Sequence, residues 1–238
     1  MTRRSDRTPR RRPSRRFGAI LLVLAIVLVP ALALVPALGA APAWAGNAAE
    51  TGASGADGPW RLCAGPIAEA EAGRPMPAHL LTAIARVEAG RWKADSAETL
   101  AWPWTVTAEG RGRFLPSKQA AIAEVKALRR RGIRNIDVGC MQINLLYHPD
   151  AFDSLEAAFD PARNVAYALD YLVGLRERWG TWTRAIGNYH SNTPSLSGKY
   201  RAKVFMTLNE VRREAVLARR AARLAARAAA NDGTTRTN

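Results

Sequence analysis

One glutamate stands among the apolar positions of a short helical pattern, a placement suited to proton transfer. Apolar residues recur at helical spacing in residues 77–90: Leu80, Leu81, Ile84 and Val87. At about 100° per residue, Glu88 lies roughly 20° from Leu81 and 40° from Ile84 on the helical wheel. Burial raises the pKa of a carboxyl, and a Glu that keeps its proton near neutral pH can act as a general acid. The alternative is a Glu at the edge of the apolar face that reaches water at the helix end.

The first 45 residues have the composition of an export signal. Residues 1–17 contain eight Arg and one Asp, and residues 18–43 are an almost uncharged run rich in Leu, Val, Ile and Ala. The run ends in Ala43-Trp44-Ala45, a small-x-small pattern suited to signal peptidase. We therefore predict a signal peptide and a periplasmic protein. A membrane anchor is the alternative, because the run is long enough to span a bilayer. The string SRRF at residues 14–17 also hints at the twin-arginine route.

Charge and composition divide the rest of the chain. Residues 46–59 are mostly small and polar and are expected to form a flexible leader. Residues 60–206 are expected to form one domain, followed by a basic Ala/Arg-rich extension over residues 207–238. Most of the net charge of +15 lies at the two ends of the chain, so we expect no nucleic-acid partner. The tail should be a solvated or frayed helix, with contact to an anionic wall polymer or membrane surface as the alternative.

The chain has only two cysteines, Cys63 and Cys140. In an oxidising periplasm such a pair indicates a disulfide, which would close a loop of about 77 residues. Two buried free thiols are one alternative. Zinc bound with His148 and His190 is another, but these residues lack the short paired spacing of a zinc site. We expect no metal and no other cofactor.

The hydrophobic pattern predicts a mostly α protein of the α+β type, with six or seven helices and one small β-hairpin. Helices are expected over residues 63–72 and 77–90, from Ser117 to Gly132, from Asp160 to Gly180, over 181–189, and from Thr193 onward. Residues 99–116 carry Trp, Val and Thr followed by two glycines, which indicates the hairpin.

Four strings in order resemble the catalytic domain of soluble-type lytic transglycosylases, the goose-lysozyme-like enzymes of bacterial cell walls. The strings begin at residues 84, 139, 160 and 185 and read IARVEAG, GCMQ, DPARNV and AIGNYHS. The family shows a Glu-Ser-Gly string that ends a helix, then Gly-Leu-Met-Gln, a helix with Asn and Tyr-Leu, and Ala-Tyr-Asn-Ala-Gly. The resemblance covers about residues 60–206 and implies a lysozyme-like fold with its helices around a glycan cleft.

The resemblance also implies roles for individual residues. Glu88 corresponds to the catalytic acid and base, Met141 and Gln142 to positions that line the glycan cleft, and Tyr189 to an aromatic residue over the sugar. Asn164 corresponds to a structural position of the long helix. His190 stands where the family has Asn, and it could contact an acetamide group or only pack at a helix end. Gln142 could bind sugar or instead brace a loop.

The implied activity is cleavage of the MurNAc–GlcNAc β-1,4 bond of peptidoglycan with formation of a 1,6-anhydro end. Most glycosidases use two carboxyl groups, whereas this family's pattern uses one. No second acid lies in a motif, because Asp137, Glu98 and Glu109 fall in or near expected loops. Ala89 replaces the family's Ser, and Cys140 replaces its Leu. These departures keep two alternatives open: a hydrolytic muramidase of the same fold, and a non-catalytic peptidoglycan-binding or assembly scaffold.

Overall fold

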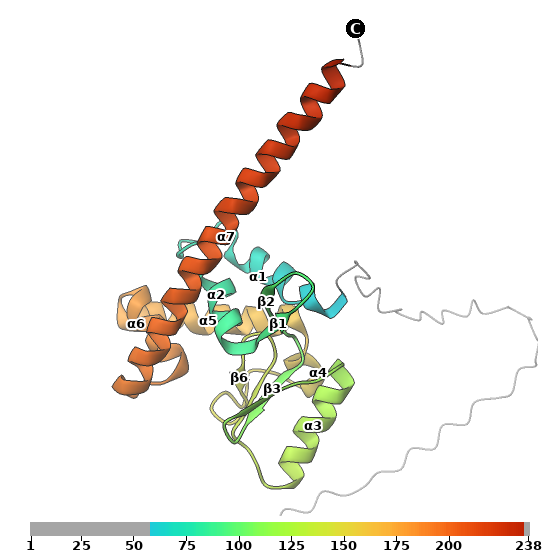
Figure 1. Ribbon diagram of the computed structural model, residues 1–238. Coiled ribbons are helices and arrows are strands. Elements are labelled where there is room, and N and C mark those ends of the chain that lie inside the picture. The colour runs from blue at the N-terminus through green and yellow to red at the C-terminus, as the bar shows by residue number, and fades with distance from the viewer. Residues whose placement is uncertain (1–57, 236–238) are drawn as a thin grey trace, which may run out of the picture. The chain divides into compact units, whose positions relative to one another are not determined.

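The computed structural model of the chain describes residues 58–235 and confirms a mostly helical protein with small antiparallel sheets (Figure 1). The predicted signal peptide and all but the last two residues of the predicted leader lie outside the described residues. The helices are η1 (Gly58–Arg61, a 3-10 turn), α1 (Ala64–Glu71), α2 (Leu80–Ala89), α3 (Lys118–Arg130), α4 (Leu155–Ala158), α5 (Pro161–Trp179), α6 (Trp182–His190) and α7 (Pro194–Thr235). The strands are β1 (Gly90–Lys93), β2 (Glu98–Ala101), β3 (Thr105–Ala108), β4 (Arg111–Phe114), β5 (Ile136–Val138) and β6 (Ile143–Asn144).

Side-chain caps set three of the predicted helix starts. The side chains of Ser117, Asp160 and Thr181 each accept a hydrogen bond from the backbone N–H three residues later, which confirms the starts of α3, α5 and α6. Gly180 ends α5 in the left-handed conformation, with φ of 76°. Local capping chemistry therefore fixes the first residues of these three helices and the last residue of α5.

Helix α2, which carries Glu88, differs from its expected bounds at one end. It begins at Leu80 rather than Pro77, because His79 adopts a left-handed φ of 66° and interrupts the turn before it. It ends before Gly90, as predicted, but Gly90 has an ordinary φ of −64°. A side chain at position 90 would collide with the carbonyl of Arg86 and with Thr99 of β2. Gly90 thus permits the close approach of β2 to the end of α2.

The expectation of a single hairpin was wrong, because the described residues contain two sheets. The expected hairpin is β3–β4, joined by Glu109 and Gly110, both with positive φ, as a two-residue turn requires. β5 and β6 extend it to a four-stranded antiparallel sheet in the order β4-β3-β5-β6. β1 and β2 form a separate hairpin directly after α2. These strands are four residues long or shorter, too short for a clear alternating pattern.

Two hydrophobic clusters hold the fold together. One contains the buried faces of α1, α2, α5, α6 and α7. The other lies between the four-stranded sheet and α3, and contains Val106, Val125, Leu128, Ile136 and Val138. Because side chains alternate along a strand, Ile136 and Val138 enter this second cluster while Asp137 between them points to the opposite face of the sheet.

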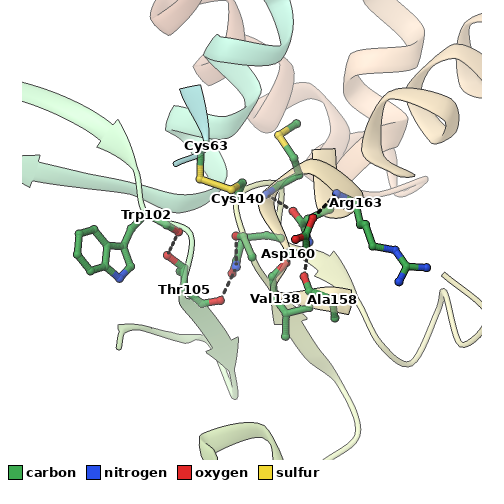
Figure 2. Close-up of a disulfide and its surroundings, with 12 residues drawn as sticks. Cys63, Trp102, Thr105, Val138, Cys140, Ala158, Asp160 and Arg163 are labelled. Atoms are coloured by element: carbon green, nitrogen blue, oxygen red, sulfur yellow. Dashed lines mark hydrogen bonds between the residues drawn. A yellow bond between two sulfur atoms is a disulfide. The ribbon is translucent and has the colours of Figure 1, made fainter. Parts of the chain in front are cut away.

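The turn between β5 and β6 is anchored from two sides. The predicted disulfide between Cys63 and Cys140 is confirmed, and both cysteines are buried (Figure 2). Asn164 of α5 is completely buried; its Oδ1 accepts from the N–H of Met141, and its Nδ2 donates to the carbonyls of Val138 and Ala158. Asn164 was expected to have a structural role in the long helix. Its role is to hold this turn against α5.

Helix α7 packs over its first part and is solvated over its second part. Tyr200, Val204, Leu208 and Val211 are buried, and Arg86 of α2 pairs with Glu214 at 2.7 Å. Residues 216–231 are all exposed, and α7 continues alone beyond the other helices (Figure 1). The tail is helical and exposed over these residues, and the helix continues without a break from the packed part. None of the helices in the described region is both long and apolar enough to cross a bilayer.

We expect the double substitution Cys63→Ala/Cys140→Ala to lower the free energy of unfolding by about 2–4 kcal/mol, because the bond closes a long loop in the unfolded chain. Urea unfolding followed by circular dichroism measures the change. Reductant should destabilise the wild-type protein by a similar amount and leave the variant unaffected. Equal stability of the two proteins would contradict a structural role for the bond.

Candidate functional site

A cavity of about 630 Å³ lies between the four-stranded sheet and the ends of α2 and α6. It brings together four of the predicted site residues, Glu88, Gln142, Tyr189 and His190. Met141 does not line it, because its side chain is completely buried. The remaining lining residues are mostly polar or aromatic: Thr107, Asn135, Asp137, Ile143, Asn144, Tyr147, His148, Tyr171, Asn188, Ser191 and Asn192.

Glu88 is positioned by the last turn of α2 and by a tyrosine far along the chain. Leu81 and Ile84 on the same face are fully buried, so the carboxyl stands where the apolar face meets the cavity. The hydroxyl of Tyr200, from α7, donates to Glu88 Oε1 at 2.6 Å. Burial raises the pKa of Glu88 to about 7; the Tyr200 hydrogen bond opposes this rise, Asp137 adds to it, and Lys203 opposes it. Glu88 can therefore hold or release a proton near neutral pH.

Asp137 is a second carboxyl group in the same cavity, which the sequence analysis did not foresee. It lies opposite Thr107 and Asn144 in the sheet, and all three line the cavity. Burial raises the pKa of Asp137, while a 2.8 Å hydrogen bond from Asn144 and the charge of His190 act to lower it. Asp137 was expected in or near a loop, whereas it is the middle residue of β5. The strand has only three residues, so its alternation of apolar and polar side chains is too short to have placed Asp137 on a strand from the sequence.

Gln142 uses its amide group to brace the sheet. Its Nε2 donates to the carbonyls of Thr105 and Gly139, each at 3.1 Å, and its Oε1 is buried without a hydrogen-bond partner. The residue has a positive φ of 48° at the end of the turn between β5 and β6. The bracing alternative therefore accounts for both amide hydrogens, and the remaining acceptor, the amide oxygen, is itself buried.

Aromatic side chains form the wall of the cavity next to Gln142. The hydroxyl of Tyr189 donates to the carbonyl of Met141 at 3.0 Å, so Met141 positions this wall through its backbone. The ring of Tyr189 packs against Tyr171, which in turn packs against His148. Aromatic rings next to hydroxyl and amide groups suit a ligand with both apolar and polar faces, such as a sugar.

His190, at the end of α6, packs against Tyr200 of α7. Their rings stack at 4.8 Å with an angle of 9° between planes, and His190 is exposed while Tyr200 is buried. Tyr200 has the spacing of a core residue of its helix, together with Val204, Leu208 and Val211. Because its neighbours at helical spacing are apolar, the sequence did not indicate that its hydroxyl binds a carboxyl group. That hydroxyl donates to Glu88, which is 112 residues away in sequence. Nothing local in the sequence indicates that contact.

Comparison with protein-family models, with curated proteins and with solved structures finds no match for this chain. What the site can do chemically is therefore inferred from its own side chains. Within the described part of the chain, no three His, Cys, Asp or Glu side chains are placed together to hold a metal ion. Two carboxyl groups with raised pKa, in a polar and aromatic cavity, are equipped for acid–base catalysis on a polar substrate.

Two substitutions should move the pKa of Glu88 in opposite directions. Tyr200→Phe removes a hydrogen bond to the carboxylate and should raise the pKa above about 7, whereas Asp137→Asn removes a nearby negative charge and should lower it. NMR titration of the carboxyl carbon measures both. Tyr147→Phe, at an exposed cavity residue, is the matched control and should leave the pKa unchanged. Shifts in the same direction would contradict this account of the site.

Proposed function

We propose that the protein is a periplasmic, lysozyme-like lytic transglycosylase that cleaves the MurNAc–GlcNAc β-1,4 bond of peptidoglycan. The observation that carries the proposal is the carboxyl of Glu88, with a pKa of about 7, at the wall of a 630 Å³ cavity. A general acid is most effective when its pKa lies near the working pH. The cavity would then be the glycan cleft.

The arrangement of the strings supports the resemblance on which the proposal rests. Residues from the first, second and fourth strings, Glu88, Gln142 and Tyr189, line one cavity although they span more than 100 residues. The third string supplies Asn164, which fixes the turn that carries Gln142. The buried disulfide supports export, because such bonds persist in oxidising compartments such as the periplasm.

In this mechanism Glu88 acts twice. Its protonated carboxyl gives a proton to the glycosidic oxygen as the bond to the anomeric carbon breaks, and the acetamide oxygen of the muramic sugar stabilises that carbon. The Glu88 carboxylate then takes the proton of the C6 hydroxyl as its oxygen bonds to the anomeric carbon. The 1,6-anhydro ring forms without water, and Glu88 regains its proton. Tyr200 stabilises the carboxylate between the two steps.

The position of Asp137 in the cavity favours a second candidate function, that of a hydrolytic muramidase. Inverting glycosidases use a second carboxylate to activate water, and retaining ones use it as a nucleophile. Asp137 faces the same cavity as Glu88, and its charge acts on Glu88. The sequence offered no second acid in a motif, whereas the cavity contains one, so the choice between transglycosylation and hydrolysis depends on what Asp137 does.

Glu88→Gln should reduce the release of soluble fragments from purified cell wall by at least about 100-fold, because it removes the transferable proton. Wild-type activity should fall as the pH rises through about 7, where Glu88 loses its proton. Glu177→Gln, on the exposed face of α5, is the matched control and should keep full activity. Unchanged release by the Glu88 variant would refute the proposal. Glycan binding by the wild-type protein without turnover would favour the scaffold alternative.

Asp137→Asn separates the two enzymatic candidates. A transglycosylase should keep most of its activity, with its alkaline limit moved to lower pH, and should release anhydro products. A hydrolase should lose about 100-fold or more of its rate. The wild-type hydrolase should also release fragments heavier by one water molecule, as mass spectrometry shows directly. Heavier wild-type products together with an inactive Asp137 variant would replace the first candidate by the second.

A further inference from the structure

A second, smaller cavity of about 280 Å³ adjoins Glu88. It forms where the ends of α2 and α6 meet the first turns of α7. Glu88 and His190 line both cavities, so the smaller one opens directly beside the proposed reaction centre. Its other lining residues are Val87, Leu196, Lys199, Tyr200 and Lys203.

The chemistry of this second cavity differs from that of the first. Lys199 and Lys203 are one helical turn apart on α7, so both ammonium groups lie on the same side of the helix. Both are exposed, and neither forms a salt bridge among the described residues. Val87 and Leu196 add an apolar surface next to them. Two ammonium groups beside a small apolar surface suit a carboxylate on a short aliphatic or peptide branch.

We propose that the second cavity binds a carboxylate on the branch of the sugar that lies next to the scissile bond. This inference rests on the proposed function, because the muramic sugar of peptidoglycan carries a lactyl ether that a short peptide extends. A glycosidic oxygen at Glu88 places that sugar at the boundary between the cavities, within reach of Lys199 and Lys203. The carboxylate comes either from the peptide or, where the peptide has been removed, from the lactyl group itself.

Binding to the inactive Glu88→Gln protein tests the proposal without turnover. Calorimetry would compare three soluble ligands: wall fragments with the peptide intact, the same fragments with the peptide removed, and unbranched N-acetylglucosamine oligomers. Lys199→Gln/Lys203→Gln, added to this protein, should weaken binding of a carboxylate-bearing ligand by roughly 3- to 10-fold, since two exposed charge pairs are lost. Lys118→Gln/Lys126→Gln, on α3, removes the same charge away from both cavities and should change nothing.

The unbranched oligomers should bind equally well with and without Lys199 and Lys203. Weakening confined to the intact fragments would identify the peptide carboxylate, and weakening confined to the peptide-free fragments would identify the lactyl carboxylate. Equal effects on all three ligands, no effect, or no binding of any ligand would overturn the proposal. Turnover of cell wall by the wild-type protein is scored separately. If the wild-type protein turns over cell wall but the lysine substitutions have no selective effect, only this inference is refuted. If the lysine substitutions act selectively on binding but the wild-type protein shows no turnover, only the proposed function is refuted.

Discussion

The turn between β5 and β6 is the point at which the sheet and the helices are fixed to each other. Cys140 of this turn is bonded to Cys63, and Asn164 binds the backbone on both sides of Cys140 through two hydrogen bonds, to Met141 and Val138. A third bond joins Asn164 to the carbonyl of Ala158. Backbone groups buried without partners are costly, so Asn164 satisfies a requirement that no apolar residue could meet. The turn carries Gln142, and its Met141 carbonyl holds the hydroxyl of Tyr189. The cavity wall opposite Glu88 is thus built on this one short segment.

In the strand that leads into this turn, successive side chains alternate between the two faces of the sheet. Ile136 and Val138 enter the cluster beneath α3, and Asp137 faces the cavity. The same strand therefore contributes to stability on one face and to chemistry on the other. Glu88 reaches the cavity by a different route, at the end of a helix whose apolar face is buried. Two carboxyl groups from unrelated elements line the same cavity because the sheet and α2 are held at a fixed position.

The helices could be predicted because the signals that mark their ends are local in the sequence. Ser117, Asp160 and Thr181 cap through bonds to residues three positions away, and such signals are written in the sequence. The disulfide and the desolvated Glu88 followed from composition and helical spacing. The additional strands, Asp137 in the cavity and the bond from Tyr200 to Glu88 depend on segments distant in sequence. Nothing in the sequence of a three-residue strand, or of a tyrosine spaced as a buried helix residue, indicates which distant segments it contacts.

Helix α7 has a mechanical consequence. Between Tyr200, which holds Glu88, and residue 231 it contains neither Pro nor Gly, the residues at which helices most often kink. At 1.5 Å per residue this stretch is a stiff rod roughly 45 Å long. Six arginines occupy one third of its circumference, within about 120° of the helical wheel: Arg212, Arg213, Arg219, Arg220, Arg223 and Arg227. The outer part of the helix thus carries a continuous cationic side, joined without a break to the segment whose Tyr200 donates a hydrogen bond to Glu88.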